Sequence, residues 1–252
     1  MTVKERIELW KTHPERFLDT SGRSGAKTYA AVNDGGWYLK VGARGSLRKE
    51  YETLCYFSAE SITPELLGYE SEEYDYLLTR PLAGKRACDA DLMKDPERLA
   101  QALGEALRIF HEQRRAKCPF SNSVEDMLAR AKRNHRRGIW DERLAAYVGA
   151  EDRDRLYAQL FGEKECLRDD VILHGDYCLP NIFLDDQYAL TGFLDLGAAG
   201  RGDRHFDLFW GRWSLQYNLK TDRHGDAFYE AYGWDAIDGD RLRLMGYAAV
   251  LG

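Results

Sequence analysis

Two carboxylates and one amide follow short apolar runs in the last third of the chain, at a spacing that could bind a metal ion. Asp176 lies five residues before Asn181, and Asp195 lies fourteen residues after it. Hard oxygen ligands suit Mg²⁺, which keeps several waters and takes further ligands from phosphates. Phosphoryl transfer needs such a metal and one carboxylate that orients the attacking hydroxyl. The pattern predicts a Mg²⁺-dependent kinase with Asp176 beside the acceptor and Asn181 and Asp195 on the metal.

The alternative interpretation is that Asp176 and Asp195 only cap turns, as aspartates beside glycine often do. Each aspartate taken alone is equally consistent with a cap. The apolar strand before each aspartate and the interval between Asp176 and Asn181 occur together in this chain. This combination favours the metal site.

A second chemical signal is Lys40, which lies inside the apolar strand pattern Tyr38-Leu39-Lys40-Val41. An unpaired ammonium there would be costly, so nucleotide phosphates and a glutamate from a helix would explain it. Residues 47–58 have helical spacing and contain two glutamates near the sides of the helix, Glu50 and Glu52. A lysine that points outward into solvent is the alternative.

The segment from Asp176 to Asp207 resembles the catalytic and metal loops of the aminoglycoside phosphotransferases, above all the 3′-phosphotransferases, which have a protein-kinase-like fold. The resemblance implies that Asp176 is the catalytic aspartate and that Asn181 and Asp195 bind the metal. It also implies that His174 and Asp207 brace the catalytic loop rather than act as a base.

The resemblance extends to the nucleotide. Glu50 matches the partner of the lysine, with Glu52 as the alternative if the alignment shifts. Residues 20–29 resemble a nucleotide-positioning loop, where backbone N–H groups and Ser24 would approach the β-phosphate. The residues that match the hinge, where backbone groups bind adenine, are Arg80, Pro81 and Leu82.

The elements that must position these residues follow from the hydrophobic spacing. Strands are expected over 17–21, 27–32, 37–41, 66–69, 74–79, 171–173, 182–184 and 189–194. Helical spacing is expected from 99 to 110, over most of 123–161 and from 203 onward. With the resemblance, this predicts an α+β, bilobal, protein-kinase-like fold. The expected parts are an N-terminal nucleotide-binding lobe with an antiparallel sheet (1–80), a hinge (81–84) and a larger, mainly helical C-terminal lobe for catalysis and acceptor binding (85–252).

Composition narrows the range of partners. The chain has 252 residues and a formal net charge of −6, so we expect no nucleic-acid partner, which would require a basic footprint. No signal peptide or run of roughly 20 apolar residues is visible, so we expect no membrane contact and a cytoplasmic location. Five scattered cysteines are expected to be reduced thiols, several of them buried. We expect a monomer or a weak dimer.

The sequence contains conflicting signals for the acceptor. The resemblance implies ATP-dependent transfer, with Mg²⁺, to the 3′-hydroxyl of an aminoglycoside, which confers resistance; GTP is an alternative donor. Acidic pockets suit such polycations, yet residues 130–137 are rich in basic side chains, which we interpret as a solvated helix face. Residues 244–252 contain no acidic side chain, and Ala198 stands where the family commonly has arginine. The alternatives are a kinase of another hydroxyl-bearing metabolite or amino sugar, and a catalytically silent nucleotide-binding module.

Overall fold

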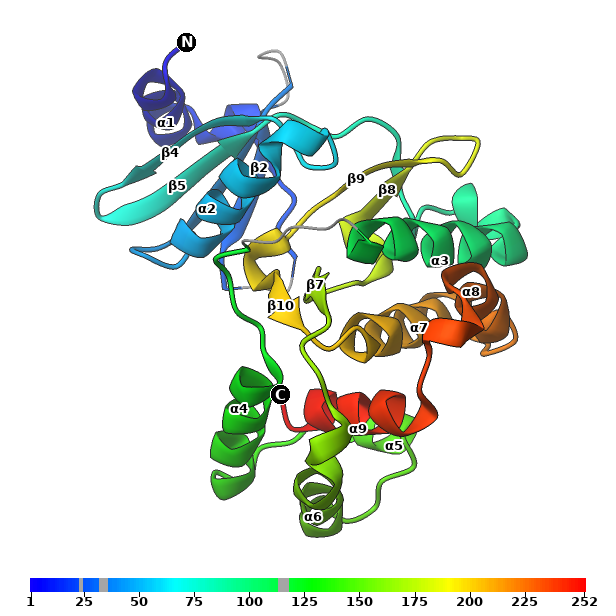
Figure 1. The fold of residues 1–252 in the computed structure, drawn as a ribbon. Coiled ribbons are helices and arrows are strands. Elements are labelled where there is room, and N and C mark those ends of the chain that lie inside the picture. Colours follow the sequence, from blue (N-terminus) through cyan, green and yellow to red (C-terminus); the bar gives the residue numbers. More distant parts are fainter. Residues whose placement is uncertain (23–24, 32–35, 113–117) are drawn as a thin grey trace. The chain divides into compact units, whose positions relative to one another are not determined.

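The computed structural model describes residues 1–22, 25–31, 36–112 and 118–252, which form two compact units (Figure 1). The first unit consists of Met1–Gly84, Phe183–Asp185 and Thr191–Gly197. The second consists of Lys85–Ile182, Asp186–Leu190 and Ala198–Gly252. The chain therefore passes between the units several times.

The first unit contains a five-stranded antiparallel sheet in the order β1-β2-β3-β5-β4. Its strands are β1 (Phe17–Asp19), β2 (Lys27–Ala31), β3 (Tyr38–Ala43), β4 (Leu66–Ser71) and β5 (Tyr74–Thr79). Its helices are α1 (Val3–Thr12) and α2 (Arg48–Phe57). The expected strands and the helix over 47–58 are confirmed, with ends that differ by two residues at most.

The helix α1 was not expected from the spacing of apolar residues, because Ile7 is its only buried residue. Its start carries a capping box: the Thr2 hydroxyl accepts from the backbone N–H of Glu5, and the Glu5 carboxylate accepts from the backbone N–H of Thr2. This pair three positions apart is a local signal for a helix start, and it would have identified α1.

The two faces of the sheet are covered by different helices. Leu39 and Leu78 pack with Ile7 of α1, whereas Leu77 packs with Leu54 of α2. Because side chains alternate along a strand, Lys40 projects to the α2 side, opposite to Leu39. The strand period therefore directs the lysine toward the helix that carries the glutamates.

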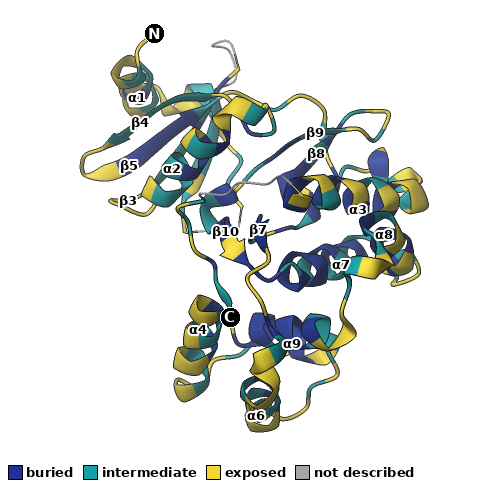
Figure 2. Cartoon of the chain, viewed as in Figure 1, coloured by how far each residue is buried: buried dark blue, intermediate teal, exposed yellow. Residues whose placement is uncertain are grey.

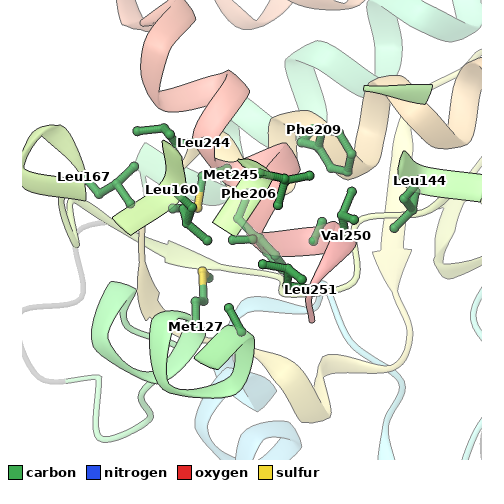
Figure 3. Close-up of a cluster of buried hydrophobic side chains, with 14 of the residues drawn as sticks. Met127, Leu144, Leu160, Leu167, Phe206, Phe209, Leu244, Met245, Val250 and Leu251 are labelled. Carbon is green, nitrogen blue, oxygen red and sulfur yellow. The ribbon is translucent and has the colours of Figure 1, made fainter. Parts of the chain in front are cut away.

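The second unit is mainly helical. Its helices are α3 (Pro96–Glu112), α4 (Val124–Arg136), α5 (Glu142–Tyr147), α6 (Arg153–Glu163), α7 (His205–Leu219), α8 (Gly225–Tyr232) and α9 (Gly239–Val250). Two short strands, β7 (Val171–Leu173) and β10 (Gly200–Gly202), pair antiparallel. Figure 3 shows a core cluster in which buried side chains of α4, α5, α6, α7 and α9 meet, such as Met127, Leu144, Leu160, Phe209 and Met245.

A hairpin follows the predicted catalytic loop. Its strands are β8 (Ile182–Leu184) and β9 (Leu190–Phe193), and the short strand β6 (Lys85–Arg86) extends the sheet in the order β6-β8-β9. Short 3-10 turns complete the chain at Pro14–Arg16, Ser58–Glu60, Leu92–Lys94, Lys164–Cys166, Leu179–Asn181, Leu196–Ala198 and Trp234–Ala236. The boundary between the units runs through the hairpin.

The helices of the second unit differ in how far they are buried (Figure 2): α9 is mostly buried, whereas α4 has an exposed face. The solvated face expected for the basic cluster is confirmed by its exposed members, which are Lys132, Arg133, Arg136 and Arg137. The expectation of several buried cysteines is wrong: all five are described, and they are half-buried or exposed free thiols. Among the described helices, none is long and apolar enough to cross a membrane.

Candidate active site

The predicted catalytic loop leaves the buried strand β7 and enters the turn Leu179–Asn181 in the second unit. The structure brings Asp176 and Asn181 together: Asn181 Nδ2 donates to the backbone oxygen of Asp176 at 3.0 Å and to its Oδ2 at 2.9 Å. Asp176 is exposed, whereas Asn181 is 8% exposed. Because the Nδ2 group is used on Asp176, the oxygen of the Asn181 amide is its remaining ligand atom.

Asp207, which is fully buried in the first turn of α7, holds the backbone of this loop. Its Oδ2 accepts from the backbone N–H of His174 at 2.6 Å, and its Oδ1 accepts from that of Gly175 at 2.9 Å. His174 Nδ1 accepts from the backbone N–H of Asp176 at 3.2 Å. These contacts agree with a bracing role for His174 and Asp207, and His174 Nδ1 is engaged inside the loop.

A hydrogen-bonded chain continues from Asp207 into the helical core and was not predicted. His111 Nε2 lies 3.1 Å from Asp207 Oδ2, and His111 Nδ1 lies 2.8 Å from the Tyr232 hydroxyl. Arg204 donates to the same hydroxyl at 3.3 Å. His111 and Tyr232 are far from Asp207 and from each other in sequence and carry no local spacing signal, so sequence reasoning could not group them with it.

The helix α7 also supports the far end of the loop. The Ser214 hydroxyl of α7 accepts from the backbone N–H of Leu179 at 3.0 Å. Burial raises the pKa of the neighbouring Cys178 thiol well above its usual range, and the Asp176 carboxylate adds to the effect. Cys178 is therefore a protonated thiol beside Asp176, not a nucleophile.

In the first unit, Lys40 binds two carboxylates. Its Nζ lies 2.8 Å from Glu50 Oε2 and 2.6 Å from Asp195 Oδ1. The side chains of Lys40 and Glu50 are 16% and 14% exposed, and that of Asp195 is 48% exposed. The outward-pointing alternative for Lys40 is therefore wrong. Glu52 instead pairs with Arg48 on the surface at 2.9 Å, so Glu50 is the helix partner.

The charges of Lys40, Glu50 and Asp195 affect the pKa values of Lys40 and Glu50. Burial alone would lower the pKa of Lys40, but the charges of Glu50 and Asp195 outweigh it and raise that pKa. Burial raises the pKa of Glu50, against the opposing effect of Lys40. Lys40 is thus a fixed cation, and the partly exposed Asp195 has the freer carboxylate of the two.

The start of α2, and with it Glu50, is fixed by the fully buried Asp75 of β5. Asp75 Oδ2 accepts from the backbone N–H of Leu47 at 2.9 Å, and Oδ1 accepts from the Ser71 hydroxyl at 2.6 Å. Burial alone would raise the pKa of Asp75, but the hydrogen bonds, led by that from Ser71, outweigh it and lower the pKa. A carboxylate at this place satisfies N–H groups that the helix start leaves unpaired.

The remaining predicted nucleotide residues lie at the end of the first unit. Ser24 lies outside the described residues. The backbone N–H of Arg80 donates to Glu65 O at 2.9 Å, and Pro81 has no N–H. Of the three hinge residues, Leu82 alone therefore has a backbone donor that could face an adenine. Gly84, at the end of the predicted hinge, adopts φ +84°, and an added Cβ there would lie 2.3 Å from the backbone oxygen of Leu184.

Known proteins similar to this chain identify its family. The model of the phosphotransferase enzyme family matches residues 18–246. A probable aminoglycoside 3′-phosphotransferase of Lactococcus lactis subsp. lactis (strain IL1403) is 36% identical over 238 residues, which cover 94% of this chain and 90% of that protein. The streptomycin 3″-kinase of Streptomyces griseus is 32% identical over 257 residues, or 94% and 92% of the two chains.

A solved structure of an aminoglycoside-3′-phosphotransferase of type VIII superposes with a TM-score of 0.73 at 25% identity, covering 94% of this chain and 93% of that one. The antiparallel sheet, the helical unit and this likeness confirm the expected α+β, protein-kinase-like fold. The family model and the two relatives each match most of the sequence. The chain belongs to the phosphotransferase enzyme family, and within it is most like the aminoglycoside 3′-phosphotransferases.

Proposed function

We propose that the protein is an ATP-dependent O-phosphotransferase that moves the γ-phosphate of ATP to the 3′-hydroxyl of an aminoglycoside and thereby confers resistance. The observation that carries the proposal is the contact of Asn181 with the carboxylate of Asp176, in a chain 36% identical to a probable aminoglycoside 3′-phosphotransferase. This contact holds an exposed carboxylate in place for an incoming hydroxyl. The added phosphate dianion lowers the net positive charge of a polycation, which weakens its electrostatic binding to an anionic target.

Each residue has a chemical task in this reaction. Asp176 orients the acceptor hydroxyl and accepts its proton as the oxygen attacks the γ-phosphorus, while the β–γ bridging oxygen leaves with ADP. The carboxylate is exposed, and Asn181 restrains it. Lys40 binds the α- and β-phosphates, and Glu50 keeps its ammonium aimed at them.

The donor atoms suit Mg²⁺. The amide oxygen of Asn181 and the half-exposed carboxylate of Asp195 are hard oxygen ligands, and two protein ligands suffice when phosphates and waters supply the rest. Bound there, Mg²⁺ would neutralise charge on the phosphates. Asp195 Oδ1 pairs with Lys40, and its backbone adopts φ +56°, a conformation that aspartate tolerates better than most residues.

For the nucleotide, we propose that the backbone N–H of Leu82 donates to the base. The two residues before it cannot take this role, since the N–H of Arg80 donates to Glu65 and Pro81 has no N–H. A single backbone donor distinguishes adenine from guanine only weakly. GTP is therefore a donor to test beside ATP, in a protein that we expect to act in the cytoplasm as a monomer or weak dimer.

Three observations favour a second acceptor class. The chain is also 32% identical over almost its full length to a streptomycin 3″-kinase, and the acidic ending expected of a 3′-enzyme is absent from 244–252. Ala198 packs its backbone oxygen and methyl group against Gly175, beside the loop that carries Asp176. The position beside this loop where the family commonly has an arginine therefore carries no charge in this chain.

The test is release of ADP by purified protein with ATP and Mg²⁺, using kanamycin, neomycin, streptomycin and uncharged sugar alcohols as acceptors. Asp176→Ala should abolish turnover and leave ATP binding within about twofold of wild type. Asp186→Ala removes an exposed hairpin carboxylate paired with Lys85 at 3.0 Å and is the matched control with full turnover.

The outcomes separate the candidates. Phosphorus NMR of the product would identify the modified hydroxyl and distinguish a 3′- from a 3″-enzyme. Turnover that survives Asp176→Ala would contradict the catalytic role of that residue. ATP binding without ADP release for any acceptor would support a silent nucleotide-binding module.

A further inference from the structure

The hydrogen-bonded chain behind Asp207 joins the ends of three helices in the second unit. His111 lies in the last turn of α3, Tyr232 is the last residue of α8, and Arg204 directly precedes α7. Asp207 Oδ2 accepts from the catalytic loop and from His111 at the same time. The chain therefore ends on the carboxylate that holds the backbone beside Asp176.

Every donor in this chain is determined by the chemistry of its neighbours. Asp207, a carboxylate, can only accept, so His111 donates from Nε2, and in the neutral imidazole its Nδ1 is then the acceptor. Tyr232 must then donate its O–H to His111 Nδ1. The guanidinium of Arg204 can only donate, so it donates to the Tyr232 oxygen. Each hydrogen bond from Arg204 through Tyr232 and His111 is therefore donated in the direction of Asp207.

Three of the four side chains that form these hydrogen bonds are buried, so water does not replace a hydrogen bond that is lost between them. Tyr232 is 1% exposed, His111 is 6% exposed and Asp207 is fully buried. Burial raises the pKa of Tyr232 to about 12, against the opposing effect of Arg204, so its hydroxyl stays protonated and can donate. Without that hydroxyl, His111 Nδ1 would be a buried acceptor with no donor, and its ring orientation would no longer be determined.

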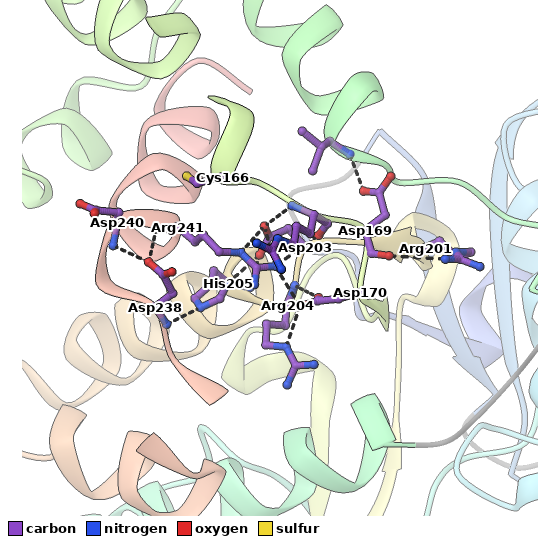
Figure 4. A network of polar contacts seen from close by, with 12 residues as sticks. Cys166, Asp169, Asp170, Arg201, Asp203, Arg204, His205, Asp238, Asp240 and Arg241 are labelled. Atoms are coloured by element: carbon purple, nitrogen blue, oxygen red, sulfur yellow. Dashed lines mark hydrogen bonds and ion pairs between the residues drawn. The ribbon is translucent and has the colours of Figure 1, made fainter. Parts of the chain in front are cut away.

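The outer end of the chain is held by an ion-pair network, shown in Figure 4. Arg204 Nε donates to Asp170 Oδ2 at 3.1 Å, and Arg241 donates to the same oxygen at 2.8 Å. Arg241 also donates to the fully buried Asp203 at 3.0 Å. Arg204 is thus held in one geometry while it contacts Tyr232.

We propose that Tyr232 and Arg204 are positioning residues for the catalytic loop, which act through His111 and Asp207 on the segment that carries Asp176. The proposal rests on the proposed function for its kinetic consequence and on the described contacts for its structural one. Neither residue touches substrate. Their effect is to keep the Asp207 carboxylate aligned with the backbone N–H groups of the loop.

The first experiment compares Tyr232→Phe with Tyr188→Phe, which removes a part-buried hydroxyl bonded to Leu92 O at 3.0 Å elsewhere in the same unit. Tyr232→Phe should lower kcat about five- to tenfold, the range for one lost hydrogen bond. Its KM for ATP and its Tm should match those of Tyr188→Phe within about twofold and about 3 °C. An unchanged kcat, or a loss that lies in KM, overturns the proposal.

The second experiment uses Arg204→Lys, which keeps a cation beside Asp170 but lacks the fork that also reaches Tyr232. It should lower kcat about two- to threefold. The double variant Arg204→Lys/Tyr232→Phe should be no slower than Tyr232→Phe alone, because both changes break the same link. Multiplicative effects overturn the proposal, and if Tyr232→Phe fails to fold, Arg204→Lys against wild type carries the test.

Amide hydrogen exchange provides a readout that needs no turnover. In the nucleotide-free protein, the N–H groups of His174 and Gly175 should exchange at least about fivefold faster in Tyr232→Phe than in Tyr188→Phe. Wild-type protein that turns over no acceptor would count against the proposed function only. Unchanged exchange at both amides would overturn the positioning role even in an active enzyme.

Discussion

Gly175 offers a sharp test of how the catalytic loop is built. It adopts φ +84°, and a Cβ added there would lie 2.4 Å from the backbone oxygen of Ala198 and 2.8 Å from its Cβ. The left-handed conformation costs an L-residue about 1–2 kcal/mol, and overpacking against backbone costs about 1–3 kcal/mol. Gly175→Ala should therefore lower the free energy of unfolding by about 2–5 kcal/mol.

Thermal unfolding followed by circular dichroism measures this loss. For a domain of 150–250 residues each kcal/mol lowers Tm by about 2–4 °C, so a fall of about 4 to 20 °C is expected. ADP release should fall as well, because the Gly175 N–H donates to Asp207 and the next residue is Asp176. Gly162→Ala is the matched control: Gly162 is exposed in α6 with no atom within 4 Å of an added Cβ, and alanine favours the helix. A Gly175→Ala protein within about 2 °C of this control would refute the reasoning.

Three further predictions concern buried charges. Because hydrogen bonds lower the pKa of Asp75, its contribution to stability is present at neutral pH and lost as pH falls through the folded pKa, below about 4; Asp75→Asn should flatten the fall of Tm there. Lys40→Met removes the cation beside Glu50 and should weaken ATP binding about 10- to 100-fold by calorimetry. Arg241→Met leaves the buried Asp203 without its guanidinium and should cost about 3–5 kcal/mol in denaturant unfolding.

Exposed ion pairs supply the controls. Lys94→Met removes a lysine that pairs with Asp91 at the surface and should leave ATP affinity unchanged. Arg243→Met removes a guanidinium that pairs with Glu163 and should cost at most about 1 kcal/mol. Parallel curves of Tm against pH for wild type and Asp75→Asn would contradict the first prediction, and equal losses for Arg241→Met and Arg243→Met would contradict the third.

The strands and helices that carry the site residues were predictable from sequence because each has a clean local period. Tyr74–Thr79 and Ile182–Leu184 match their expected ranges fully, since apolar runs bounded by turn residues have few alternatives. The helix α1 was missed because one buried residue leaves almost no periodic signal. Its capping box was the feature of the sequence from which the helix could have been predicted.

The candidate site was predictable only where chemistry and spacing coincide. Lys40 was identified because an ammonium within an apolar strand needs a partner, and the structure supplies Glu50 and Asp195. The second carboxylate was not expected as a partner of the lysine, because nothing local relates positions 40 and 195. The roles of Asp176 and Asn181 remain predictions, although their contact agrees with them.

The bracing residues His174 and Asp207 were expected from the family resemblance, but the supports further from the loop could not be predicted. Asp75 reaches the start of α2 across a sheet, and Tyr232 reaches Asp207 through His111. Such contacts depend on tertiary packing, which one sequence does not encode in any short interval. They are nevertheless the residues that decide how firmly the predicted site is held.

The course of the chain limits how this protein can be divided or recombined. It passes between the compact units at 84/85, 182/183, 185/186, 190/191 and 197/198. A fragment that stops at Gly84 would therefore lack Asp195, and Lys40 would keep only one of its two counter-ions. An exchange of the first unit between relatives must therefore transplant Phe183–Asp185 and Thr191–Gly197 together with the amino-terminal sheet.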